Sequence, residues 1–166
     1  MKKISTCITF VFFIFLINAT SKAQFVVREG KWKGKMKMYQ ESVALDSIDV
    51  IMSITPRIKD SVWQWKTEYL SPKMPMTKDY QLRVSDRKKG AYITDEGDGV
   101  LLSDYGFGNK LMSHFSTEGI MLTATYEWIG NQLIFEVTSG KADSNSSSGV
   151  TSYTIKHLQR GELIKE

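Results

Sequence analysis

The chain has 166 residues, 42% of them hydrophobic, which predicts a single domain with a core of reasonable size. Its formal net charge is +4, but three lysines and no acidic residue precede Gln24, so residues 24–166 carry only +1, which does not favour a nucleic-acid-binding protein. The single cysteine, Cys7, lies in the same N-terminal stretch. Because residues 24–166 contain no cysteine, they cannot form a disulfide, a cysteine-ligated zinc site or a thiol nucleophile.

The N-terminal segment is predicted to be an export signal. Two lysines follow Met1, residues 8–19 are almost entirely apolar, and small residues stand at Ser21 and Ala23, where a signal peptidase reads the chain. We expect residues 1–23 to leave as a signal peptide and residues 24–166 to form one exported domain, periplasmic or extracellular, without a stable membrane span. The alternative is an uncleaved anchor, but the apolar run is well short of the roughly 20 residues that cross a bilayer.

The first expected strand, within residues 30–38, alternates lysine with other residues. Because successive side chains of a strand point to opposite faces, one face is predicted to be solvated and the other apolar. The expected outer face holds Lys31, Lys33, Lys35 and Lys37, and the expected inner face holds Trp32, Gly34, Met36 and Met38. The lysine row could bind an anionic partner, but a solvated outer face that discourages edge pairing is the interpretation we favour.

The same two-residue period continues along the chain, and no long segment has helical spacing. It predicts further strands within residues 48–54, 63–69, 80–85, 120–128, 132–138 and 151–158. Turns are expected at residues 56–60, 97–99, 106–109, 118–119 and 130–131, and longer loops at 71–76 and 139–149. We therefore predict an all-β fold, a single antiparallel up-and-down β-barrel of about eight to ten strands.

A family resemblance agrees with this fold. Gly30, Trp32 and Gly34 on the first strand, together with the meander over residues 29–160, resemble the calycin superfamily of lipocalins, fatty-acid-binding proteins and nitrobindin-type barrels. Arg160 is similar in placement to the late arginine that covers the first-strand tryptophan in lipocalins. The resemblance implies a calycin-like barrel with a ligand cavity, and it implies no particular ligand.

Large side chains on the expected inner faces are the candidates for binding. They offer flat, polarizable surfaces to an apolar ligand, but small barrels are often filled by their own side chains, so both a cavity and a filled interior remain open. The candidate ligand-binding residues are Trp32, Met36, Met38, Trp63, Trp65, Tyr69, Tyr126 and His157.

His157 raises one cofactor question. Nitrobindin-type barrels use a histidine near the C-terminus as a haem ligand, and His157 is similar in position, although a solvated histidine at a strand end is the simpler interpretation. The sequence otherwise predicts no cofactor and no metal site, and because no catalytic motif is visible it does not predict an enzyme. The expected function is binding of a small hydrophobic or amphipathic molecule; the alternative is a filled barrel that acts as an interaction domain.

Overall fold

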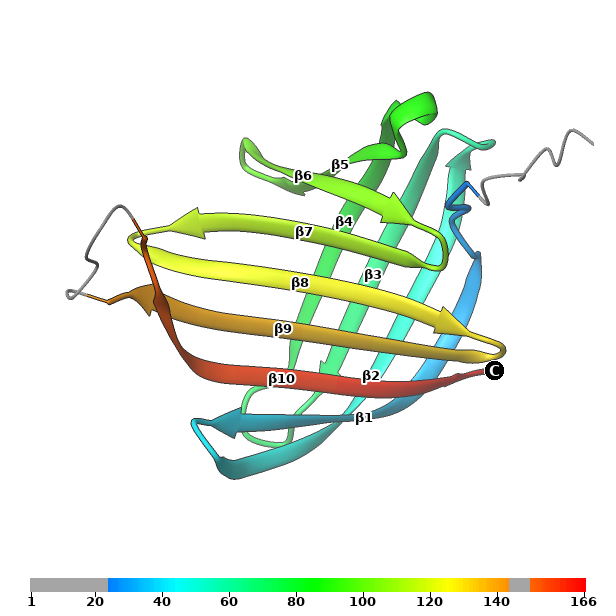
Figure 1. Ribbon diagram of the computed structural model, residues 1–166. Helices are drawn as coiled ribbons and strands as arrows, with labels where there is room; N and C mark the ends of the chain where they lie inside the picture. The colour runs from blue at the N-terminus through cyan, green and yellow to red at the C-terminus, as the bar shows by residue number, and fades with distance from the viewer. Residues whose placement is uncertain (1–23, 144–149) are drawn as a thin grey trace, which may run out of the picture.

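The protein is a closed barrel of ten antiparallel strands with almost no helix, as the sequence predicts (Figure 1). This computed structural model describes residues 24–143 and 150–166. The predicted signal peptide, residues 1–23, lies outside the described residues, as does part of the predicted loop 139–149. Within the described ranges no helix is both long enough and apolar enough to cross a membrane.

Ten strands and one short 3₁₀ helix, η1, make up the fold. In chain order they are β1 (Gly30–Gln40), β2 (Val43–Ile58), β3 (Val62–Leu70), β4 (Met76–Asp86), η1 (Arg87–Lys89), β5 (Ala91–Gly97), β6 (Val100–Phe107), β7 (Lys110–Thr117), β8 (Ile120–Ile129), β9 (Gln132–Ala142) and β10 (Tyr153–Lys165). Each strand pairs with its neighbours in the chain, and β1 pairs with β10 to close the sheet. The connectivity is therefore the predicted up-and-down meander.

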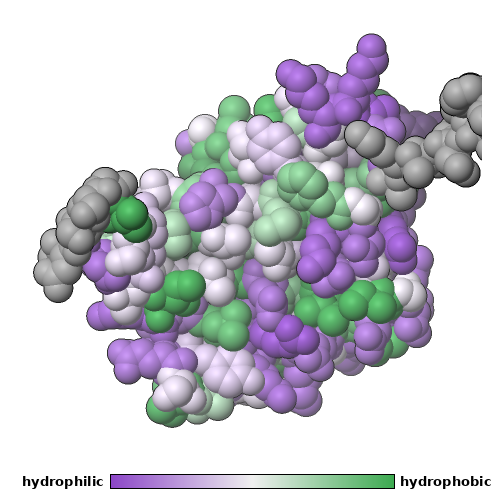
Figure 2. Space-filling model, viewed as in Figure 1, coloured by the Kyte–Doolittle hydropathy of each residue, from purple (hydrophilic) through white to green (hydrophobic). Residues whose placement is uncertain are grey.

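Strand β1 has the two faces that its alternation predicts. Trp32 and Met36 are buried, whereas Lys31, Lys33 and Lys35 are exposed. The outer surface in general mixes polar and apolar side chains, as Figure 2 shows for one face. The lysine row thus lies on the solvated side of the barrel.

One end of the barrel is filled by aromatic side chains and closed by the segment that precedes β1. Phe25 contacts Tyr92 and Trp128, with ring centroids 5.4 and 5.6 Å apart, and the Tyr92 hydroxyl donates a hydrogen bond to the Phe25 carbonyl at 3.3 Å. We call this cluster the aromatic plug; its members are Phe25, Trp32, Trp63, Tyr92 and Trp128, all of them buried.

The sheet is less complete toward the other end. Strands β6 and β7 pair through only four residue pairs, from Asp104 with Ser113 to Phe107 with Lys110. Residues 100–103 and 114–117 continue these strands without pairing with each other, and β6 diverges from β7 toward the β5–β6 turn (Figure 1). We call this the open end; it also carries the turn between β1 and β2 and the loop between β3 and β4.

Several sequence-based boundaries were wrong: the last strand, expected within residues 151–158, runs from Tyr153 to Lys165, and two segments expected in turns or loops lie in strands. Pro56, expected in a turn, lies within β2; beyond Ile54 this strand has no β1 partner, so a residue without an N–H is tolerated there. The segment 139–142, expected in a loop because of its Ser and Gly content, continues β9 because β10 pairs with it as far as Ala142.

The covering role that the resemblance implies for Arg160 was also wrong. Arg160 lies inside β10, opposite Lys37 of β1, and its guanidinium pairs with Glu136 at 2.5 Å and Glu162 at 3.1 Å. The cation over the Trp32 ring is Lys165, whose Nζ is 5.4 Å from the ring centroid.

Gly34 provides a test of barrel closure. A Cβ at this position would meet the Glu162 carbonyl oxygen and come within 2.9 Å of the Leu163 Cα, both backbone atoms of β10. We expect Gly34→Ala to lower the free energy of unfolding by roughly 1–3 kcal/mol, the usual cost of overpacking. Urea denaturation measures this loss, with the exposed Lys33→Ala as the matched control; equal stability of the two variants would contradict the close approach of β1 to β10.

Candidate ligand-binding cavity

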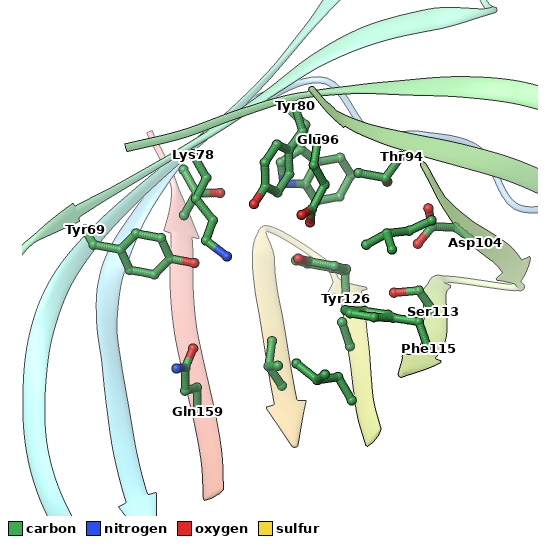
Figure 3. Close-up of a pocket in the computed structure, with 16 residues that line it drawn as sticks. Tyr69, Lys78, Tyr80, Thr94, Glu96, Asp104, Ser113, Phe115, Tyr126 and Gln159 are labelled. Atoms are coloured by element: carbon green, nitrogen blue, oxygen red, sulfur yellow. The ribbon is translucent and has the colours of Figure 1, made fainter. Parts of the chain in front are cut away.

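The barrel encloses a cavity of about 190 Å³ beside the aromatic plug, toward the open end (Figure 3). Its walls are the inward-facing residues of β3 to β10, supplied by every second position of each strand. Such a volume corresponds to about six water molecules at roughly 30 Å³ each. The polar and aromatic residues that line it are Trp65, Thr67, Tyr69, Lys78, Tyr80, Thr94, Glu96, Asp104, Ser113, Phe115, Tyr126 and Gln159. We call this space the inner cavity.

Aromatic contacts form the boundary between the inner cavity and the plug. Trp65 packs edge-on against Tyr126, with ring centroids 4.8 Å apart, and against Trp128 at 6.0 Å. Tyr126 in turn stacks on Phe135 at 6.2 Å. Trp65 and Tyr126 therefore belong to the wall of the cavity while resting on buried aromatic side chains.

A second space of about 220 Å³ adjoins the inner cavity and is mostly apolar. Both spaces are lined by Tyr69, Lys78 and Gln159, which therefore stand at their junction. We call the second space the methionine pocket, because its walls include Met36, Met38, Met74 and Met76 beside Ile48. Met74 is 76% exposed, so the pocket reaches the protein surface at the β3–β4 loop.

The tyrosines of the inner cavity are neutral hydrogen-bonding groups. Burial raises the pKa of Tyr69 to about 12, with a further contribution from the nearby Glu96 charge. The pKa values of Tyr80 and Tyr126 are raised further above their usual range, again mainly by burial. The Tyr80 hydroxyl also donates a hydrogen bond to the Glu96 carboxylate. At neutral pH all three hydroxyls are therefore protonated.

Asp104 is the most deeply buried charged residue of the inner cavity. Only 3% of its surface is exposed, and burial raises the pKa of its carboxyl to about 6 against the opposing effect of hydrogen bonds from Thr94 and Ser113. Its Oδ2 atom has no hydrogen-bond partner among the described residues. Figure 3 shows the side chain projecting from β6 into the cavity. An unpartnered carboxylate oxygen in a buried position lowers stability, and a hydrogen-bond donor on a ligand would offset that cost.

The structure distributes the predicted site residues over four environments. Trp65, Tyr69 and Tyr126 line the inner cavity, and Met36 and Met38 line the methionine pocket together with Tyr69. The remaining predicted residues lie elsewhere: Trp32 and Trp63 belong to the aromatic plug, and His157 is exposed. For all of them a role in ligand binding stays a prediction.

His157 does not fit the proximal ligand of an enclosed haem. Its side chain is exposed near the open end and is not among the residues that line the inner cavity or the methionine pocket. A register shift between Ile155 and His157 also interrupts the alternation that the sequence analysis used to orient it. Over the described ranges, no group of three or more His, Cys, Asp or Glu side chains is placed to hold a metal ion.

Sequence reasoning missed Asp104, Glu96 and Lys78. Glu96 directly precedes the turn expected at residues 97–99, but it is the penultimate residue of β5 and faces inward. Asp104 follows Leu102 by two positions, so the parity of β6 could have placed it inside the barrel. That strand has no clear alternation of polar and apolar residues, and the signal was correspondingly weak.

The raised pKa of Asp104 predicts a pH-dependent gain in stability for Asp104→Asn. The folded-state pKa of about 6 lies above the ordinary value of 3.8, so the free-energy cost of burying the ionised carboxylate is absent below pH 4, grows as the pH rises to 6 and then stays constant. We expect the variant to be more stable than the wild type by roughly 3 kcal/mol above pH 7, with little difference near pH 4. Urea titrations at both pH values measure this; an equal difference at both would contradict the shift.

Comparison with known proteins identifies the fold but no family. No family model and no curated protein matches the sequence. Among solved structures, the S-type phycobiliprotein lyase CPES from Guillardia theta is similar over 83% of this chain and 88% of its own, with a TM-score of 0.60 and 7% sequence identity. The chain therefore has a barrel fold similar to that of a phycobiliprotein lyase, consistent with the expected calycin-like barrel.

Proposed function

We propose that this barrel binds a small amphipathic molecule, with its polar head in the inner cavity and its apolar part in the methionine pocket. The observation that carries the proposal is the contiguity of the two spaces, which share Tyr69, Lys78 and Gln159. Concave sites that combine apolar walls with a few convergent polar groups are typical of ligand-binding proteins. The similar fold of the phycobiliprotein lyase supports a barrel architecture, and at 7% identity it supports no lyase chemistry for this chain.

The methionine pocket suits a flexible apolar chain. Methionine side chains are unbranched and polarizable, so they adapt to irregular apolar surfaces. Burial of each methylene contributes about 0.8 kcal/mol, so a chain of six to eight methylenes would gain roughly 5–6 kcal/mol before the cost of its ordering. The exposed Met74 and Met76 at the β3–β4 loop would be the first side chains that such a ligand meets.

The alternative of a filled interaction barrel is less favoured. The aromatic plug does fill one end of the barrel, but the inner cavity and the methionine pocket leave about 190 and about 220 Å³ open beside it. A domain that worked through its outer surface alone would not need a buried carboxylate facing a cavity, since such a group lowers stability.

Ala124 offers a direct test of ligand binding. This residue lines the inner cavity from β8, and a leucine there would occupy part of the 190 Å³. We expect Ala124→Leu to weaken the binding of the fluorescent apolar probe N-phenyl-1-naphthylamine by about tenfold or more while the protein stays folded. Probe titration followed by displacement with octanol measures this effect.

The matched control is Thr125→Leu, which adds a similar side chain at the next position of the same strand. Thr125 is not among the residues that line the inner cavity. Probe binding should therefore be unchanged in this variant. If the wild type shows neither probe binding nor a co-purified small molecule in native mass spectrometry, the proposed function is wrong.

We also propose that the protein is exported after removal of residues 1–23. The basic start, the apolar run over residues 8–19 and the small residues Ser21 and Ala23 support this. Expression of the full chain in a Gram-negative host and intact-mass analysis of the periplasmic fraction should find a chain that begins at Gln24. Recovery of the full-length mass from the cytoplasm alone would contradict export.

A further inference from the structure

The inner cavity contains carboxylates that lack a cationic partner. Only 3% of the surface of Asp104 is exposed. Glu96, on the neighbouring strand β5, lines the same space. Neither residue takes part in an ion pair within the described part of the chain. Buried charged groups in proteins are normally paired, so an unpaired carboxylate that faces a cavity indicates a missing cation.

Lys78 does not fill this role. Its Nζ atom lies 5.7 Å from the centroid of the Tyr80 ring, at the junction between the inner cavity and the methionine pocket. The ammonium group thus lies over an aromatic face of β4, whereas Asp104 projects from β6 (Figure 3). With two carboxylates and one ammonium group, the charged lining of the inner cavity favours a positively charged ligand.

The remaining walls also suit a cation. Trp65, Tyr80 and Tyr126 line the inner cavity, and aromatic faces attract ammonium groups at distances up to about 6 Å. Hydrogen bonding with Thr94 and Ser113 lowers the pKa of the Asp104 carboxyl against the larger effect of burial, and its Oδ2 atom has no partner among the described residues. The cavity therefore combines a charge, a free acceptor and aromatic surfaces.

From this arrangement we infer that the natural ligand is an amphipathic amine whose protonated nitrogen donates a hydrogen bond to the Asp104 carboxylate. This inference rests on the proposed function and specifies its ligand class. The amine lies among the tyrosines of the inner cavity, and its apolar part extends past Tyr69 and Lys78 into the methionine pocket. The part of the ligand that lies at the junction is beside the Lys78 ammonium group, which would repel a second positive charge there.

A series of ligands with one tail and different heads tests the inference. We would titrate octylamine, octyltrimethylammonium, octanol and octanoate into the wild-type domain at pH 7.5 by isothermal titration calorimetry. We expect octylamine to bind about tenfold or more tightly than octanol, and octanoate to bind most weakly. Octyltrimethylammonium keeps the charge but has no N–H, so weaker binding of this compound than of octylamine would show that the hydrogen bond contributes.

Asp104→Asn removes the charge while it keeps the size of the side chain. In this variant octylamine should lose about tenfold in affinity or more, whereas the affinity for octanol should be unchanged. The matched control is Asp79→Asn, which removes one negative charge on an exposed strand position whose carboxylate accepts hydrogen bonds from Gln64 on the outer surface. Its affinity for octylamine should match that of the wild type.

The outcomes separate this inference from the proposed function. The amine assignment is wrong if octanol and octylamine bind equally well, or if Asp104→Asn leaves the affinity for octylamine intact. The cavity would then bind amphiphiles without recognising an amine. If octanoate binds most tightly, the head group is an anion held by Lys78. If none of the four compounds binds to the wild type, the proposed function itself fails for ligands of this size.

Discussion

The fold depends on the packing of aromatic side chains at one end of the barrel. Trp32 from β1 and Trp128 from β8 are each 1% exposed, and Phe25, from the segment that precedes the barrel, packs against Trp128. Together these side chains bury several hundred square ångströms of apolar surface, at roughly 150–250 Å² for each aromatic residue. Because this end supplies so much of the core, the other end of the barrel does not have to be filled.

The stability of the plug is what makes polar residues inside the barrel tolerable. The raised pKa of Asp104 corresponds to a cost of roughly 3 kcal/mol at neutral pH, a large share of the 5–15 kcal/mol by which an average domain is stable. Burial of one large aromatic side chain contributes about as much in the opposite direction. A buried carboxylate that lowers stability is therefore affordable here, and its retention is easier to explain by binding than by folding.

The alternation in the sequence was sufficient to predict the fold and the direction of most side chains. The lysine row of β1, the inward Trp32 and Met36, and the inward pair Trp63 and Trp65 all lie where the two-residue period places them. The alternation does not show how far along the barrel axis an inward side chain lies. Trp63 packs in the plug and donates its indole N–H to Glu29 at 2.9 Å, whereas Trp65 lines the cavity, because two positions along one strand shift a side chain by about 6–7 Å along it. Asp104 was missed for the related reason that a single aspartate forms no pattern.

The charged residues on the two faces of the sheet differ in how they are paired. The outer face of β1 carries lysines. Lys35 forms an ion pair there with Asp49 at 3.0 Å, and an exposed ion pair of this kind contributes little to stability. The inner cavity instead holds Glu96 and Asp104, which form no ion pair among the described residues although Lys78 lines the same space, in a setting where a charge has a much larger effect. The proposed ligand, entering past the methionines, would meet apolar surface first and the carboxylates last. This order would fix its orientation, since an apolar chain gains nothing beside Asp104 and a cation gains little among the thioethers of Met36 and Met38.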